Sequence, residues 1–138
     1  MTEIILRGCK VAKGKAQGQA IVSYSPISFM GGVDPETGLV VEKKHELEGQ
    51  SVCDKILVFP TGKGSTVASY QIYELSCCQK APRAIVNNLA DPVVAIGAII
   101  GNIPMVHKLD PDPLKVIRTG DWVEVDADQG IVKVKRSI

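Results

Sequence analysis

An alternation of short apolar segments in the middle of the chain constrains its fold more than any other feature. Three of these segments are brief and β-branched, as buried strands typically are: Lys55–Phe59, Ala84–Val86 and Ile103–Val106. Helical patterns lie between them, one beginning at Ser65 and ending before Pro82, the other spanning Val93–Ile100. The second is preceded by a good N-cap, Asp91, with Pro92 at its first position. This order predicts a parallel sheet with right-handed crossovers.

Both ends of the chain are expected to be rich in strands. The chain begins with a short apolar run, Ile4–Leu6, and short strands are predicted at Gln19–Tyr24 and Leu39–Val41. Gly14 and Gly18 are expected to bracket a loop. Near the C-terminus, Asp121–Asp126 and Ile131–Lys135 alternate apolar and polar residues around a turn, which indicates an antiparallel hairpin. We therefore predict one α/β mixed domain, residues 1–138, with β-rich barrel or sandwich ends.

Composition argues against several classes of protein. The length of 138 residues fits a single domain, and a formal net charge of +1 gives no support to nucleic-acid binding. The four cysteines show no CxxC and no zinc-site spacing, so we expect reduced thiols and no metal site in this chain. The N-terminus is too polar for a signal peptide, and no apolar run reaches the roughly 18 residues of a membrane span. We expect a cytoplasmic protein that binds neither nucleic acid nor membrane.

The strongest local feature is the sequence FPTGKGST at residues 59–66. A buried strand ends there, a glycine turn follows, and a helix is predicted to begin with Ser65 and Thr66. Such a junction presents backbone N–H groups and the positive end of a helix dipole, which suits a carboxylate or a phosphate. Gly62 and Gly64 allow a ligand to approach the backbone closely, and Lys63 adds positive charge.

Three other interpretations of this junction are a nucleotide-binding loop, a helix cap without chemistry and part of a serine hydrolase site. It is not a nucleotide P-loop, because Gly64 separates Lys63 from Ser65 where that motif needs Gly-Lys followed directly by Ser or Thr. Ser65 could be a helix cap with no chemistry. A serine hydrolase is not favoured either, since His45 lies in a charged run, expected to be exposed, and His107 is expected at a strand end.

A second segment dense in turn-forming residues is SFMGGVDPETG at residues 28–38. It could be an ordinary surface turn. However, the apolar pair Phe29-Met30 stands beside the double glycine Gly31-Gly32, which argues that a partner or a substrate packs there. Asp34 is a possible acid or base, although Asp before Pro is also a routine turn residue.

Taken together, the motifs resemble those of a known family. They are SFMGGVDPETG, GQSVCDKILVFPTGKGSTVASYQIYEL, KAPRAIV, GAIIGNIPMV and RTGDWVEVDADQGIVKV. In this order, over essentially the whole chain, the sequence resembles the small subunit of the aconitase X family. The resemblance implies the swivelling β/β/α domain of aconitase-type enzymes, which agrees with the mixed fold predicted above.

The resemblance also implies a division of labour between two subunits. A large subunit is expected to bind an iron–sulfur cluster, with the active site between the subunits, so this chain should be inactive alone. The serine of the family's Gly-x-Gly-Ser turn, here Ser65, is implied as the proton acceptor. The candidate substrate-binding residues are Gly62, Lys63, Gly64, Thr66, Gly31 and Gly32.

The substrate and the role of the serine stay open at this point. Archaeal members of the family dehydrate (R)-5-phosphomevalonate to trans-anhydromevalonate 5-phosphate in a modified mevalonate route to isoprenoids. Related members dehydrate cis-3-hydroxy-L-proline. This chain departs from the family pattern at Ala68, where a Gly is expected, and at Asn87-Asn88, where a more acidic run is expected. A third alternative is a swivel or binding module without chemistry, in which Ser65 only caps a helix.

Overall fold

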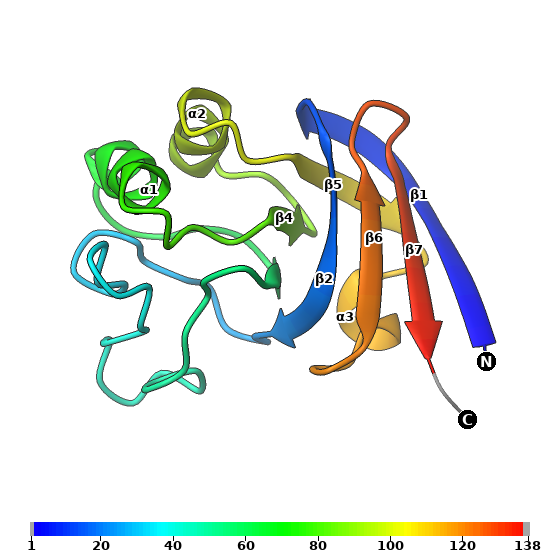
Figure 1. Cartoon of the computed structure of the whole chain (residues 1–138), viewed down its shortest axis with the longest axis horizontal. Coiled ribbons are helices and arrows are strands. Elements are labelled where there is room, and N and C mark those ends of the chain that lie inside the picture. Colours follow the sequence, from blue (N-terminus) through cyan, green and yellow to red (C-terminus); the bar gives the residue numbers. More distant parts are fainter. Residues whose placement is uncertain (1, 137–138) are drawn as a thin grey trace.

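The computed structural model describes residues 2–136, which form a closed barrel with helices outside it (Figure 1). In chain order the elements are β1 (Thr2–Ala12), β2 (Lys15–Val22), β3 (Ile56–Phe59), α1 (Ala68–Cys77), β4 (Ala84–Asn87), α2 (Pro92–Ile100), β5 (Met105–Asp110), α3 (Pro113–Val116), β6 (Trp122–Asp126) and β7 (Ile131–Arg136). Around the barrel the strand order is β1-β5-β4-β3-β2-β6-β7. The predicted α/β fold with a β-rich barrel is confirmed.

The barrel combines a parallel half with an antiparallel half. Strand β3 pairs in parallel with β2 and β4, and β4 pairs in parallel with β5. The other pairs are antiparallel, including the predicted C-terminal hairpin of β6 and β7. Because parallel strands share a direction, the loops that follow β2, β3 and β4 all leave from the same edge of the sheet.

The apolar run of β3 is continuous because both of its faces are buried. Ile56 and Val58 point into the barrel core, whereas Leu57 and Phe59 join a second core with residues of α1 and α2. This alternation follows the two-residue period of a strand. Helices α1 and α2 lie side by side outside the barrel, where Gly97 allows close contact with Ile72 (Figure 1). Each buried aliphatic side chain contributes about 1.5–3 kcal/mol to folding.

The long segment between β2 and β3 folds against the second core without regular strands. Leu39 and Val40 form only isolated bridges, so the predicted strand Leu39–Val41 was wrong. Phe29 packs edge to face on Phe59 with ring centroids 6.0 Å apart. His45 was also predicted wrongly, because its side chain is only 8% exposed. Its Nδ1 accepts from the Leu47 N–H at 3.0 Å and its Nε2 lies 3.1 Å from the Pro26 carbonyl, so the ring satisfies backbone groups that lack a strand partner.

The N-terminal strands are longer than the sequence indicated. Strand β1 spans Thr2–Ala12, well beyond the apolar run Ile4–Leu6. Gly18 lies inside β2, opposite Val123, and does not bracket a loop as predicted. These strands were underestimated because they contain glycines, a residue type that is usually depleted in sheets. A glycine is needed at position 8, because a Cβ there would lie 2.5 Å from the carbonyl oxygen of His107. Strand β2 ends at Val22, two residues before the predicted end at Tyr24.

Two further boundaries differ near the C-terminus. Strand β5 spans Met105–Asp110, beyond the predicted Ile103–Val106, and the short helix α3 was not predicted. Helix α3 is capped by Asp112, whose Oδ1 accepts from the Leu114 N–H at 2.9 Å. Among residues 2–136, no helix is long and apolar enough to cross a membrane.

Candidate functional site

The two predicted loops lie next to each other at the edge where β2 and β3 end. Ile27, which follows β2, pairs in parallel with Gly62, which follows β3. The Ile27 N–H donates to the Thr61 carbonyl at 3.3 Å, and the Lys63 N–H donates to the Ile27 carbonyl at 3.0 Å. The structure therefore brings together the segments around Gly31-Gly32 and around Gly62–Thr66.

Ser65 does not begin a helix, contrary to the prediction. Helix α1 starts at Ala68, with Val67 as its N-cap residue and no side-chain cap. The Ser65 Oγ accepts a hydrogen bond from the Val67 N–H at 3.2 Å, and its carbonyl accepts from the Ala68 N–H at 3.1 Å. A serine that bonds the backbone two residues ahead offers the chain an alternative to helix, which delays the start of α1. Ser65 consequently lies in an exposed turn just ahead of the helix.

Consecutive backbone N–H groups lie in the exposed turn that contains Ser65. Those of Gly64, Ser65 and Thr66 are in exposed residues and donate to no acceptor in the part of the chain that the structure describes. Gly64 adopts a φ of +99°, a conformation that favours glycine, and this turns the chain sharply before Ser65. Consecutive N–H groups at such a turn are a suitable site for an anion.

Ser28 joins the two glycine loops. A Cβ on Gly32 would lie 2.0 Å from the Ser28 carbonyl oxygen, and a Cβ on Gly64 would lie 2.7 Å from the Ser28 Oγ. The Ser28 hydroxyl donates to the Met30 carbonyl at 3.1 Å. Close packing on the Ser28 backbone therefore requires glycine at position 32, whereas a side chain at position 64 would displace the rotatable Ser28 hydroxyl. Sequence reasoning missed Ser28, because nothing local indicates a contact with a loop more than thirty positions away.

Lys63 is held by a carboxylate that the sequence did not reveal. Its Nζ lies 3.0 Å from the Glu42 Oε2, and the Glu42 N–H donates to the Gly32 carbonyl at 3.2 Å. The ion pair therefore links the turn after β3 to the glycine loop after β2. Lys63 is about half exposed, so a ligand could displace Glu42 or share the ammonium group.

Gly62 packs on the beginning of α2. A Cβ at Gly62 would lie 2.4 Å from the Val94 Cγ2, so only glycine fits without a shift. The predicted N-cap of this helix is confirmed, since the Asp91 Oδ2 accepts from the N–H groups of Val93 and Val94 at 3.1 and 3.2 Å. The carboxylate occupies the positive end of α2, so this helix start is not available to a substrate anion.

Glu46 fixes the chain where it leaves β2. Its Oε1 accepts from the Ser23 hydroxyl at 3.0 Å and from the Ser25 N–H at 2.8 Å, and also from the Tyr24 N–H. Partial burial raises the pKa of the Glu46 carboxyl, but these hydrogen bonds outweigh it and hold the pKa below its usual value. The loop that carries Ser28 is thereby anchored at its base.

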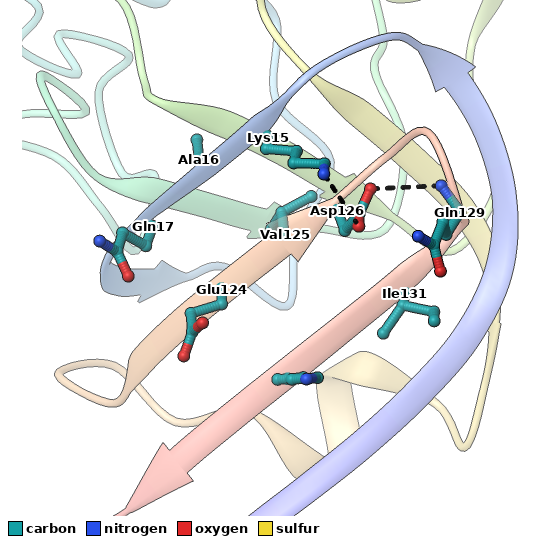
Figure 2. A pocket seen from close by; sticks show the side chains of 9 residues that line it. Lys15, Ala16, Gln17, Glu124, Val125, Asp126, Gln129 and Ile131 are labelled. Carbon is teal, nitrogen blue, oxygen red and sulfur yellow. Dashed lines mark hydrogen bonds and ion pairs between the residues drawn. The ribbon is translucent and has the colours of Figure 1, made fainter.

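Two surface grooves lie away from this edge. The larger, of about 540 Å³, is lined by charged and amide side chains of β2, β6, β7 and the turn before β7, including Lys15, Gln17, Glu124, Asp126, Gln129 and Lys133. Figure 2 shows Lys15 reaching Asp126 across the strands, at 3.8 Å. The other groove, of about 480 Å³, lies between the end of β1 and α2. Neither is lined by a predicted site residue, and Ser65 itself is exposed.

The described residues do not fit a metal cluster of their own. Among residues 2–136, no three His, Cys, Asp or Glu side chains are grouped so that they could hold a metal ion. The cysteines are unpaired, and burial raises the pKa of the Cys53 thiol above its usual value. His107 lies inside β5 and its Nδ1 accepts from the Ala90 N–H at 2.9 Å. Burial, with Lys108 beside it, lowers the pKa of this histidine.

Known proteins share both the sequence and the fold. The family model described as the aconitase X swivel domain matches residues 5–134. The phosphomevalonate dehydratase small subunit of Thermococcus kodakarensis is 54% identical over 129 residues, which cover 94% of this chain and 95% of that protein. The protein of the same name from Methanosarcina mazei is 47% identical over 134 residues, covering 97% of this chain and 93% of that protein.

Solved structures agree with these relatives. The crystal structure of Thermococcus kodakaraensis aconitase X in its holo-form matches with a TM-score of 0.92 and 51% identity, over 96% of this chain and 99% of that chain. A solution NMR structure of a UPF0107 protein matches with a TM-score of 0.87 and 41% identity, over 96% of this chain and all of that chain, 100%. The match in sequence and structure spans nearly the whole chain, which therefore belongs to the aconitase X swivel domain family.

Proposed function

We propose that this chain is the small subunit of a phosphomevalonate dehydratase and that Ser65 is its proton acceptor. The observation that carries the proposal is the exposed turn at Ser65, where the N–H groups of Gly64, Ser65 and Thr66 are unengaged within the described chain and the Val67 N–H donates to the Ser65 Oγ. The choice of substrate is supported by the relatives described above, which bear the name phosphomevalonate dehydratase small subunit.

The chemistry requires a base next to an anion-binding surface. Dehydration of a 3-hydroxy acid removes a proton from the carbon beside the carboxylate, while the hydroxyl leaves from the next carbon. A serine hydroxyl is a weak base, and its alkoxide needs donors to stabilise the charge. The Val67 N–H already donates to the Ser65 Oγ, and such preorganised donors lower the cost of an alkoxide.

The neighbouring residues take the anionic groups of the substrate in this proposal. The N–H groups of Gly64 and Thr66 can bind a carboxylate or phosphate oxygen. Lys63, which precedes Gly64 in the turn, adds an ammonium group whose present partner is Glu42. Gly62, Gly31 and Gly32 shape the approach by keeping side chains out of the loops. An anion bound at the turn also orients the proton to be removed toward Ser65.

A second surface must complete the site, because Ser65 is exposed and an alkoxide base works only where water is excluded. We propose that the large subunit supplies this surface and holds the iron–sulfur cluster, for which the described residues of this chain provide no site. Met30 and Val67 flank the predicted site residues in the sequence and are both 43% exposed, and Val41, whose N–H donates to the Gly32 carbonyl, is 47% exposed. Such exposed apolar residues are expected where a partner covers the surface. We also propose a cytoplasmic location for the pair.

Reconstitution with the large subunit tests the function directly. The pair, assembled anaerobically, is assayed with (R)-5-phosphomevalonate and with cis-3-hydroxy-L-proline, and each subunit is assayed alone as the control. We expect turnover of phosphomevalonate by the pair only. A preference for cis-3-hydroxy-L-proline would mean that phosphomevalonate is not the substrate. Turnover by the large subunit alone would mean that this chain is a swivel or binding module without chemistry.

A further inference from the structure

The strand beside the catalytic turn ends in a buried asparagine that the chemistry above does not use. Asn87 is the last residue of β4 and stands opposite Phe59, the last residue of β3. Its side chain is 0% exposed, among apolar neighbours of the two strands. A buried amide is unfavourable in such surroundings unless its hydrogen bonds are satisfied.

Asn87 fixes the point where the chain leaves β3 for the Ser65 turn. Its Nδ2 donates to the Phe59 carbonyl at 3.0 Å. The next residue, Pro60, has no N–H and so cannot continue the ladder as a donor. Instead its carbonyl accepts from the N–H groups of Asn88 and Leu89 at 3.1 and 3.2 Å. The exit of β3 is therefore tied to the exit of β4 by one side-chain and two backbone donors.

The remaining polar atom of Asn87 is not explained by stability. Its Oδ1 is buried and has no hydrogen-bond partner within residues 2–136. A leucine of similar size would remove the unsatisfied Oδ1, but the Phe59 carbonyl would then lose its side-chain donor. The amide thus holds the exit of β3 although its own acceptor stays unsatisfied, and such a compromise is typical of a site under functional constraint.

We propose that Asn87 is a positioning residue for Ser65, an inference that rests on the proposed function. The bond from its Nδ2 to the Phe59 carbonyl sets the direction of the turn that begins at Pro60. Through Thr61 and Lys63, the same turn is hydrogen-bonded to Ile27 and so to the loop after β2. Loss of the Asn87 donor therefore disturbs the alignment of both loops without removing any group that touches the substrate.

Two substitutions test this role in the reconstituted pair. Asn87→Leu removes the donor at nearly constant volume and leaves the Phe59 carbonyl without its side-chain partner, so we expect a modestly lower melting temperature and a loss of at least tenfold in kcat/KM. Hydrogen exchange at the Ile27 and Lys63 amides, which join the two loops, should become at least several-fold faster. The matched control is Ile85→Val on the same strand, which should lower the melting temperature and leave kcat/KM unchanged.

Asn87→Asp provides a readout that a purely structural role would not give. A buried aspartic acid has a raised pKa and donates a hydrogen bond only when protonated. Its activity relative to the wild-type pair should therefore rise as the pH falls, and this variant decides the question if Asn87→Leu fails to assemble.

The proposal is overturned if the Leu variant keeps kcat/KM within twofold with unchanged amide exchange, or if the activity of the Asp variant relative to wild type does not change with pH. A wild-type pair inactive on phosphomevalonate would instead overturn the proposed function, and amide exchange at Ile27 and Lys63 would still decide the role of Asn87.

Discussion

The contact between Gly64 and Ser28 can be measured as a coupling free energy. Gly64→Ala introduces two costs. An alanine at a φ of +99° is strained by about 1–2 kcal/mol. Its Cβ would also lie 2.7 Å from the Ser28 Oγ, which must rotate away and give up its bond to the Met30 carbonyl. That bond contributes about 0.5–1.5 kcal/mol, so the single variant should lose roughly 1.5–3.5 kcal/mol of unfolding free energy.

Ser28→Ala loses the same hydrogen bond by deleting the hydroxyl. In the double variant the bond is lost only once, and the alanine at position 64 meets only the Ser28 Cβ, at an ordinary 3.5 Å. We therefore expect the double variant to be more stable than the sum of the two single changes by about 0.5–1.5 kcal/mol, the energy of the bond counted once.

Urea unfolding of the three variants and the wild type measures this coupling, and Gly31→Ala is the matched control. Gly31 has a φ of +77°, and a Cβ at this position would meet nothing within 4 Å, so its substitution should show the strain alone. For a chain of this length each kcal/mol corresponds to roughly 3–5 °C in melting temperature. Additivity within about 0.3 kcal/mol would refute the close packing of the two loops on Ser28.

Two further predictions concern charged groups. Glu42→Gln removes the carboxylate that now pairs with the Lys63 ammonium. The KM of the reconstituted pair for a phosphorylated substrate should therefore fall by up to about fivefold, which is the strength of an exposed ion pair. An unchanged KM at low salt would mean that Lys63 does not contact the substrate anion. Hydrogen bonds from Arg136 hold the pKa of the Asp121 carboxyl below its usual value. The Asp121–Arg136 ion pair therefore stabilises the fold at pH values above the usual pKa of an aspartate. This stabilisation is lost as the pH falls through the lowered pKa. Urea unfolding at pH 7 and pH 3 should therefore show a smaller difference in stability for Asp121→Asn than for the wild type, and equal differences would contradict the assigned cause.

The sequence predicted those parts of the fold in which local pattern and tertiary environment agree. Helix α2 was placed well because Asp91 and Pro92 mark its start and a glycine follows its end. The C-terminal hairpin was predicted because the alternation of apolar and polar residues in its strands matches their burial in the barrel. Strand β1 was underestimated, because glycine at Gly8 is needed for a close approach to β5 and interrupts the apolar pattern. Tertiary packing, which a local pattern does not contain, decided that strand.

The candidate site could be predicted in part. The glycine-rich turn before Ser65 is a local signal, and so is the double glycine at Gly31-Gly32. The contacts that join them are not local, since Ser28 and Glu42 meet the turn only after β2 and β3 pair. The buried state of His45 was missed because its partners are backbone groups of an irregular loop, which leave no mark in the sequence.

Proton acceptance by Ser65 can be tested by one kinetic comparison. The reconstituted pair carrying Ser65→Ala is compared with the wild-type pair on (R)-5-phosphomevalonate. The control is Ser51→Ala, which removes a hydroxyl that also accepts from an N–H two residues ahead but lies outside the two site loops. We predict that Ser65→Ala lowers kcat by at least about 100-fold, as expected when a positioned acid–base group is removed, with assembly and melting temperature unchanged. Near-normal turnover by Ser65→Ala would contradict the account and leave this serine a residue of the turn alone.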